Sequence, residues 1–267
     1  MRWHSAETNL LIEEVAPAEA KKKIIRFIRD EVAKSRTDGV VLGLSGGIDS
    51  AVTGYLSVDA LGSRRVMGLI MPDLRLTPKE DVVDAKAVAS ELGIETRLID
   101  IAPIHSTFMR SLGANRMAEG NLRARIRMAI LYYHANSTNR LVVGTGDRSE
   151  LLSGYFTKFG DGGVDILPIA DLYKTEVRRL GETLGLSRRI ISKRSSPRLW
   201  SEHDAEAELG LSFDVLDSVF KLYFDRKLGT RTVSSRLKLD LDTIQNLVSR
   251  YRETGHKRQM PPICKVR

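Results

Sequence analysis

A glycine- and serine-rich segment, residues 43–50, has the residue types of a phosphate-binding loop. It lies between an apolar run and a helical pattern and consists of Gly43, Leu44, Ser45, Gly46, Gly47, Ile48, Asp49 and Ser50. Adjacent glycines let backbone N–H groups converge, and a helix N-terminus and serine hydroxyls add further positive ends, so the segment suits an oxyanion. The lysine of a Walker A loop is missing. Asp49 favours a hard cation such as Mg²⁺ between itself and phosphate oxygens; the alternative is a plain strand-to-helix turn with Asp49 as a helix cap.

Further candidate residues lie in the second half of the chain. Thr145 directly follows an apolar run, and Glu150 lies about one helical turn later. Glu150 is either a second carboxylate near the cation or a first-turn glutamate favoured by the helix dipole. Lys158 and Asp165 flank residues 160–163, whose glycines predict either a backbone bent tightly around a ligand or an ordinary hairpin turn.

Basic side chains provide the other candidates. Asn121 and Arg125 are four residues apart in a helical pattern over 119–136 and share one face with Met128 and Tyr132, whereas we expect Ile126, Ile130 and Tyr133 to pack. The alternative is a solvated arginine stripe, and we interpret Arg123 and Arg127 as surface or interface charges. Lys174 is either a phosphate-binding cation or a charge on an exposed helix. The triplet His256, Lys257 and Arg258 has the composition of a solvated tail.

Taken together, these segments resemble a known family. Residues 45–50 are similar to the pyrophosphate-binding loop of ATP pyrophosphatases of the adenine-nucleotide alpha-hydrolase-like superfamily, which also includes tRNA-modifying enzymes. Residues 120–128, 142–150 and 154–168, with Lys174 and residues 256–259, resemble NAD synthetase in the family's order. The resemblance spans about residues 20–262. Residues 194–198 and 203–210, and residues 146–148 between Thr145 and Glu150, depart from the common family pattern.

The resemblance implies ATP- and Mg²⁺-dependent conversion of deamido-NAD and ammonia to NAD, AMP and pyrophosphate through an acyl adenylate. It implies that ATP contacts residues 43–50, Thr145, Lys174 and Ser196. Asp49 and Glu150 would hold the metal, and Arg125, Lys158, Asp165, His256 and Lys257 would bind deamido-NAD. Asp49, Asp165 and Lys174 would be catalytic. The resemblance also implies a homodimer, for which the helix over 119–136 is our candidate interface.

The nitrogen source follows from cysteine usage. Cys264 is the single cysteine, three residues from the end and just after Pro261 and Pro262, and we do not expect it to be a glutaminase nucleophile. The chain is therefore predicted to use ammonia, with a separate glutaminase as a possible partner. A tRNA-modifying ATP pyrophosphatase is the alternative function, although such thiolation enzymes typically need several cysteines and the tail has little aromatic interleaving for base stacking.

Strands and helices alternate in the pattern that would position these residues. Short apolar runs predict buried parallel strands at 40–44, 66–70, 98–101 and 141–144. Helical patterns cover 21–32, 48–61, 78–92, 119–136, 172–184, 213–224 and 241–251, with a loop over 187–201. This alternation predicts an α/β doubly wound, mainly parallel sheet. We expect one domain over 1–267, with an ATP pyrophosphatase core over about 20–185 and a helical part over about 186–267.

Composition adds limits on partners and location. The net charge of +8 comes from 42 Lys and Arg against 34 Asp and Glu. Residues 1–220 carry 30 basic and 30 acidic side chains, and residues 221–267 carry 12 basic and 4 acidic, so the whole excess is C-terminal. No apolar run reaches the length of a membrane span, and Met1–Glu14 does not resemble a signal peptide. We therefore expect a cytoplasmic protein without membrane or nucleic-acid partners.

Overall fold

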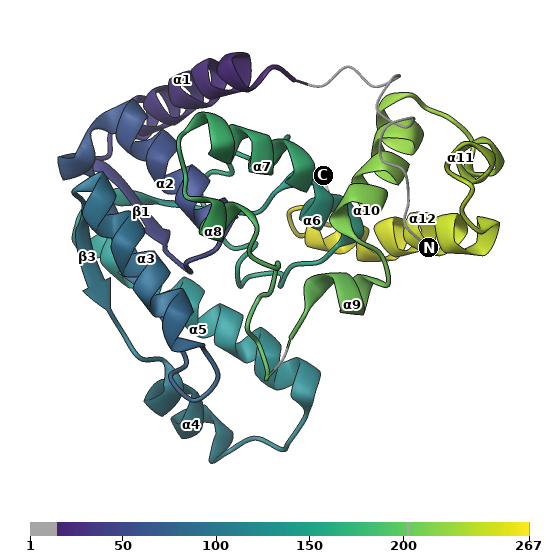
Figure 1. The fold of residues 1–267 in the computed structure, drawn as a ribbon. Helices are drawn as coiled ribbons and strands as arrows, with labels where there is room; N and C mark the ends of the chain where they lie inside the picture. The colour runs from purple at the N-terminus through teal and green to yellow at the C-terminus, as the bar shows by residue number, and fades with distance from the viewer. Residues whose placement is uncertain (1–14, 202, 267) are drawn as a thin grey trace.

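A four-stranded parallel sheet forms the centre of the fold in the computed structural model, which describes residues 15–201 and 203–266 (Figure 1). Its strands lie in the order β3-β2-β1-β4 and span Gly39–Gly43 (β1), Val66–Ile70 (β2), Glu95–Leu98 (β3) and Arg140–Val143 (β4). The chain runs outward from β1 to β3 and then returns to the other side of β1 at β4. Helices cover both faces, so the predicted doubly wound α/β fold is confirmed. The expectation about Met1–Glu14 lies outside the described residues.

The position predicted for the third strand is wrong. β3 covers Glu95–Leu98, whereas we expected a strand over 98–101. All four β3 residues are exposed at the edge of the sheet, so they lack the apolar run that marks a buried strand. The buried apolar residue, Ile101, follows the strand and precedes α4, which spans Ala102–Met109. The other three predicted strands agree with the structure to within one residue.

One face of the sheet is covered by α2 (Ile48–Leu61), α3 (Lys79–Leu92) and α7 (Lys174–Thr183). Their apolar side chains form one core cluster with Val40 and Leu42 of β1. α1 spans Pro17–Ser35, and its buried residues Ile24, Ile28 and Val32 belong to the same cluster. α1 makes its main contacts with α2 and α7.

The opposite face is covered by α5, which spans Arg116–Ser137. Ile126 and Ala135 of α5 pack with Val41 and Val142 of the central strands in a second core cluster. Tyr133, which we expected to pack, is 70% exposed, because it lies on the side of α5 that faces away from the sheet.

The C-terminal third is helical, as predicted, and has a core cluster of its own around Phe213, Phe220, Val233 and Ile244. Its helices lie to one side of the sheet in Figure 1. The remaining elements are η2 (Ser63–Arg65), α6 (Arg148–Ser153), α8 (Arg188–Ile191), α9 (Ala205–Leu209), α10 (Phe213–Phe220), the π-helical η3 (Lys221–Asp225), α11 (Thr230–Leu237), α12 (Leu241–Glu253) and η4 (Thr254–Lys257). The predicted loop over 187–201 contains α8 and otherwise has no helix or strand. Within the described part of the chain, no helix is long and apolar enough to cross a membrane.

Candidate active site

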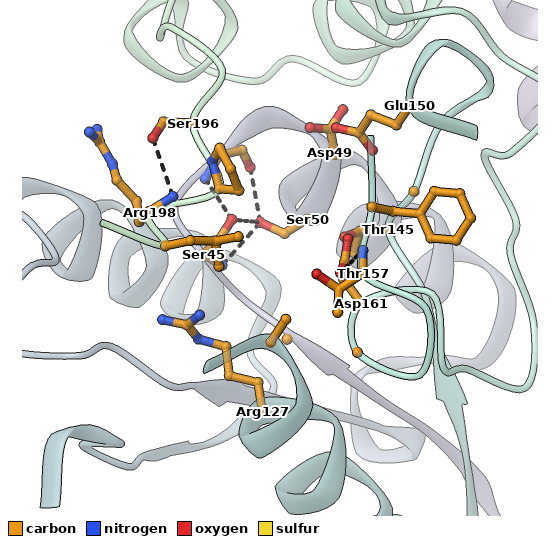
Figure 2. Close-up of a pocket in the computed structure, with 18 of the residues that line it drawn as sticks. Ser45, Asp49, Ser50, Arg127, Thr145, Glu150, Thr157, Asp161, Ser196 and Arg198 are labelled. Carbon is orange, nitrogen blue, oxygen red and sulfur yellow. Dashed lines mark hydrogen bonds between the residues drawn. The ribbon is translucent and has the colours of Figure 1, made fainter. Parts of the chain in front are cut away.

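A cavity of about 530 Å³ opens at the carboxyl ends of β1 and β4 (Figure 2). The strand order reverses between these two strands, which is where doubly wound sheets bind ligands. The phosphate-binding loop follows β1 and lines one side of the cavity, and Thr145 lines it just after β4. α5, the turn over 154–161 and the segment over 193–200 complete the walls. The fold therefore brings together most of the residues that the sequence singled out.

The loop after β1 has the geometry of an anion cradle. Gly46 has φ +76°, and a Cβ atom there would lie 2.2 Å from the carbonyl oxygen of Asp81, so glycine is required. The Ser45 and Ser50 hydroxyls are 3.1 Å apart, and Gly47 N–H donates to Ser45 Oγ at 3.2 Å. α2 begins at Ile48 with Gly47 as its N-cap and no side-chain capping bond. Asp49 is therefore not the helix cap, and the first N–H groups of α2 face a ligand-sized space.

Lys174 is buried at the centre of three carboxylates. Its side chain is 1% exposed, and Nζ lies 2.7 Å from Asp49 Oδ2, 2.8 Å from Asp147 Oδ2 and 3.1 Å from Glu150 Oε1. The alternative that Lys174 is a charge on an exposed helix is wrong. Burial alone lowers the pKa of Lys174, but the three carboxylates outweigh it and raise the pKa well above its ordinary value. Lys174 is thus a fixed cation beside the phosphate-binding loop.

Glu150 fits both interpretations that its position left open. It is the third residue of α6 and forms a capping box with Asp147, the N-cap. Its other oxygen faces Lys174 and Asp49, and Figure 2 shows Glu150 and Asp49 together at one end of the cavity. Burial raises the pKa of Glu150 well above its ordinary value. Sequence reasoning missed Asp147, although an aspartate three residues before a glutamate at a helix start is a recognisable capping signal.

The donor set at this end of the cavity fits Mg²⁺. Three carboxyl groups face one ammonium group, so when all three are ionised they carry two more negative charges than Lys174 balances. Asp49 Oδ1 is buried without a hydrogen-bond partner among the described residues. The part of the chain that the structure describes holds no group of three or more His, Cys, Asp or Glu side chains placed to cage a metal. Mg²⁺ commonly takes only one or two protein carboxylates and completes its shell with phosphate oxygens and water.

The segment over 193–200 covers the phosphate-binding loop. Lys193 Nζ donates to Gly46 O at 2.9 Å and pairs with Asp81 Oδ1 at 2.9 Å. Arg198 Nε pairs with Asp81 Oδ2 at 2.8 Å. Ser196, the predicted ATP-contacting hydroxyl, lines the cavity and donates to the carbonyl of His203. Sequence reasoning missed Lys193, whose partners Gly46, Asp81 and Asp84 all lie more than 100 residues earlier in the chain.

The interpretation of Arg123 and Arg127 as surface or interface charges is wrong. Arg123 is buried, and its Nε pairs with the fully buried Asp73 at 2.9 Å. Arg127 Nε donates to Met71 O at 2.9 Å, and the side chain lines the cavity. Burial lowers the pKa of Arg127 to about 10. Only Arg125 of this stripe is exposed, with one guanidinium nitrogen 3.3 Å from Lys158 O.

The turn over 154–163 lies against α5. Thr157 Oγ1 donates to Asn121 Oδ1 at 2.7 Å, and Asp161 lines the cavity. The hairpin alternative for the glycine run is wrong, because no pair of strands flanks it among the described residues. Asp165 does not line the cavity. Its two oxygens accept hydrogen bonds from Tyr132 OH at 2.9 Å and from Val142 N at 2.7 Å, at the outer edge of β4.

The basic C-terminal segment is anchored on this turn, so the solvated-tail alternative is wrong for its core. Lys257 Nζ donates to Gly154 O and Phe156 O, both at 2.9 Å, and lines the cavity. Lys158 Nζ donates to His256 O at 2.6 Å, although the His256 side chain is exposed. Arg250, which the sequence left without a role, also lines the cavity and donates to Ser153 O at 2.8 Å. Part of the C-terminal charge excess thus faces the cavity.

Comparisons with known proteins agree on one family. The family model described as NAD synthase matches residues 20–261. An NH(3)-dependent NAD(+) synthetase from Archaeoglobus fulgidus is 50% identical over 247 residues, which cover 92% of this chain and 96% of that protein. A solved NH3-dependent NAD synthetase from Campylobacter jejuni has a TM-score of 0.79 at 31% identity, covering 94% of this chain and 100% of that one. A solved NMN synthetase from Francisella tularensis has a TM-score of 0.82 at 32% identity, covering 94% and 99%.

Proposed function

The chain belongs to the NAD synthase family, and from this membership we propose that it catalyses the ammonia-dependent, ATP-driven amidation of deamido-NAD to NAD. The observation that carries the proposal is the anion cradle of residues 45–50 beside the buried Lys174 and its carboxylates. Such a site suits a reaction in which a pyrophosphate group is bound and expelled.

The reaction proceeds in two balanced steps. First, a carboxylate oxygen of deamido-NAD attacks the α-phosphorus of ATP, a new O–P bond forms, and the bond to the β-phosphate oxygen breaks to release pyrophosphate. Second, the nitrogen of ammonia attacks the acyl carbon, AMP leaves with the electron pair of the C–O bond, and the nitrogen loses a proton. The pyrophosphate group lies in the cradle formed by Ser45, Ser50 and the N-terminus of α2.

Each charged residue near the cradle has a supporting role. Lys174 neutralises negative charge that builds up on the departing pyrophosphate, and it holds Asp49 and Glu150 in place. Asp49 and Glu150 would hold Mg²⁺, which when bound supplies additional positive charge to phosphate oxygens. Thr145 and Ser196 line the cavity and offer hydroxyl groups to ATP. Protein groups thus mainly position and neutralise the reactants.

Deamido-NAD binds at the side of the cavity formed by α5, the turn over 154–163 and the C-terminal segment. Contacts between Arg125 and Lys158, and between Lys158 and His256, gather three of the predicted binding residues, and Lys257 lies next to them. Because Asp165 points to the edge of β4, its role in substrate binding or in orienting ammonium has support from the family resemblance alone.

The enzyme works as a homodimer in this proposal, with α5 at the interface. Supporting features are the exposed side chains of Tyr133, at 70%, and Met117, at 53%, on a helix that also carries the exposed Arg125. Sedimentation velocity of the wild type and of Tyr133→Glu tests this assignment. A monomeric wild type, or a variant dimer of unchanged stability, contradicts it.

Ammonia is the nitrogen source of this chain. Cys264 is exposed and is not among the residues that line the cavity. A glutaminase nucleophile needs a base that activates its thiol in a site of its own, and Cys264 is not a candidate for that role. A separate glutaminase could supply ammonia to the enzyme in the cell, and a cytoplasmic location is compatible with the free thiol.

The direct test supplies the purified chain with ATP, Mg²⁺ and deamido-NAD, together with either ammonium or glutamine. We expect equal amounts of NAD and AMP with ammonium and none with glutamine. Nicotinic acid mononucleotide replaces deamido-NAD in a parallel reaction, because the structural relatives include an NMN synthetase. Turnover of the mononucleotide alone would refute deamido-NAD as the substrate. The family match does not support the alternative function, a tRNA-modifying ATP pyrophosphatase. Binding of tRNA that weakens steeply with salt would be evidence for that function.

A further inference from the structure

Arg127 is a cation that lines the cavity and forms no ion pair within the part of the chain that the structure describes. It lies on α5, and its Nε donates to Met71 O at 2.9 Å, just beyond the end of β2. Its two terminal guanidinium nitrogens have no hydrogen bond or ion pair within residues 15–201 and 203–266. Because the side chain lines the cavity, these N–H groups are available to a ligand.

The surroundings of Arg127 differ from those of its neighbours. Arg123, one helical turn earlier, is neutralised by Asp73 and also donates to Leu199 O at 3.2 Å. Arg125 is exposed to solvent. Arg127 is desolvated enough that burial lowers its pKa to about 10, and within the described residues the hydrogen bond to Met71 O and the negative charges of Asp73 and Asp161, neither of which forms an ion pair with it, offset only part of this cost. A partly buried guanidinium with free donors favours a bound anion, because two parallel N–H groups match the oxygens of a phosphate or carboxylate.

The position of Arg127 separates it from the metal-binding end of the cavity. In Figure 2, Arg127 rises from α5 below Ser45, well apart from Asp49 and Glu150. Arg127 therefore lies on the far side of Ser45 from Asp49 and Glu150, where it can meet a group other than the phosphates beside those carboxylates. Its anchor, Met71 O, belongs to residues 69–72, which line the cavity with apolar side chains and backbone.

We propose that Arg127 binds the oxyanion at the bond-forming end of the reactants, either the α-phosphoryl group of ATP or the pyridine carboxylate that attacks it. The inference rests on the proposed function and assigns a ligand contact to a residue that the pattern of the sequence placed on the surface. Both groups carry planar or near-planar pairs of oxygens that accept from a guanidinium fork. Both also meet at the same point when the acyl adenylate forms.

Calorimetric titration of four ligands into the full chain measures their affinities and distinguishes these two anions. AMP and adenosine differ by the α-phosphate, and deamido-NAD and NAD differ by the carboxylate. The variants are Arg127→Gln, which keeps a donor but removes the charge, and Arg127→Lys, which keeps the charge but removes the fork. Arg236→Gln, an exposed position on α11, is the matched control.

We expect Arg127→Gln to weaken AMP or deamido-NAD by about 10- to 100-fold, the loss of one or two charge-assisted hydrogen bonds. Adenosine and NAD should change less than about twofold, and Arg127→Lys should lie between the wild type and Arg127→Gln. Loss for AMP identifies the phosphoryl group as the anion, and loss for deamido-NAD identifies the carboxylate.

Unchanged affinity for all four ligands overturns the proposal, as does an equal loss within each pair, which would show a structural effect. If Arg127→Gln does not fold, the comparison of Arg127→Lys with the wild type decides by the same pairs. A wild type that forms no NAD at all would refute the proposed function, an outcome that the turnover assay detects without any Arg127 variant.

Discussion

Replacing Lys174 with methionine should destabilise the protein strongly, because it removes the cation that pairs with three carboxylates. The Lys174 Nζ atom makes ion pairs of 2.7, 2.8 and 3.1 Å with Asp49, Asp147 and Glu150, and its side chain is 1% exposed. Removing one partner of a buried ion pair typically costs about 3–5 kcal/mol, because the remaining charge is left buried and unpaired. We expect Lys174→Met to lower the free energy of unfolding at pH 8 by about this amount and to abolish NAD formation.

The loss should shrink as the pH falls. Burial raises the pKa of Glu150 well above its ordinary value and also raises that of Asp147, so each contributes stability below its unfolded pKa that is lost as pH rises through its folded pKa. Without Lys174 the folded pKa values of both carboxyls rise further. The destabilisation by Lys174→Met should therefore be smaller at pH 5.5 than at pH 8, because a larger fraction of the Asp147 and Glu150 carboxyls is protonated at the lower pH.

Urea unfolding at several pH values measures both effects. Lys34→Met, at a side chain that is 77% exposed, is the control and should change the unfolding free energy by less than about 0.5 kcal/mol. Adding Glu150→Gln to Lys174→Met should restore about 0.5–3 kcal/mol of stability, because it removes one of the repelling charges. A loss below about 1 kcal/mol, or a loss that does not depend on pH, would refute the view that Lys174 holds this cluster together.

Three further predictions concern other parts of the molecule. Burial raises the pKa of Asp217 to about 6. As the pH rises from 4 through 6, the unfolding free energy of the wild type should therefore fall relative to that of Asp217→Asn, by about 3 kcal/mol at most. Parallel pH profiles of the two proteins would contradict this prediction. Gly46→Ala should raise the KM for ATP at least about tenfold, because the new Cβ atom would lie 2.2 Å from the carbonyl oxygen of Asp81. Gly62→Ala is the control: its φ is +82° and the space around it is open, so it should cost stability and leave the KM for ATP unchanged. Lys257→Met should raise the KM for deamido-NAD about tenfold and leave that for ATP within twofold, with the exposed Lys265→Met as control; equal changes in both constants would argue against a dinucleotide contact.

Buried strands and local helix patterns were predictable from the sequence because their signals are local. The runs at 40–44, 66–70 and 141–144 correspond to β1, β2 and β4, and the helix over 48–61 matches α2 at both ends. The position of β3 was not predicted correctly, because an exposed edge strand lacks the apolar run of a buried strand. The first fully buried residue after it, Ile101, is the N-cap of α4.

The phosphate-binding loop was predictable for the same reason, since its glycines and serines are adjacent in the chain. Lys174 was a weaker candidate, because its burial depends on Asp49, 125 residues earlier, and no local pattern records such a contact. The roles of Lys193 and Arg250 depend on backbone carbonyls that are also distant in sequence, at Gly46 and Ser153, 147 and 97 residues earlier.

The arginines on α5 show most clearly which features of the site could not be predicted from the sequence. Arg123, Arg125 and Arg127 alternate along the same helix and look equivalent in the sequence. One is buried against Asp73, one is exposed, and one lines the cavity, because the helix turns by about 100° per residue and packs against different segments on each side. Only the packing of Asp73 and Met71 next to α5 distinguishes them.

Exchange of labelled pyrophosphate into ATP tests adenylation at the phosphate-binding loop most directly. With deamido-NAD and Mg²⁺ present and ammonia absent, the wild type should exchange label, because formation of the acyl adenylate is reversible. Omitting deamido-NAD should stop the exchange, and so should Asp49→Asn, whose side chain keeps its size but loses the carboxylate that faces Lys174 at 2.7 Å. Exchange without deamido-NAD, or near-normal exchange by Asp49→Asn, would contradict an acyl adenylate formed at this site.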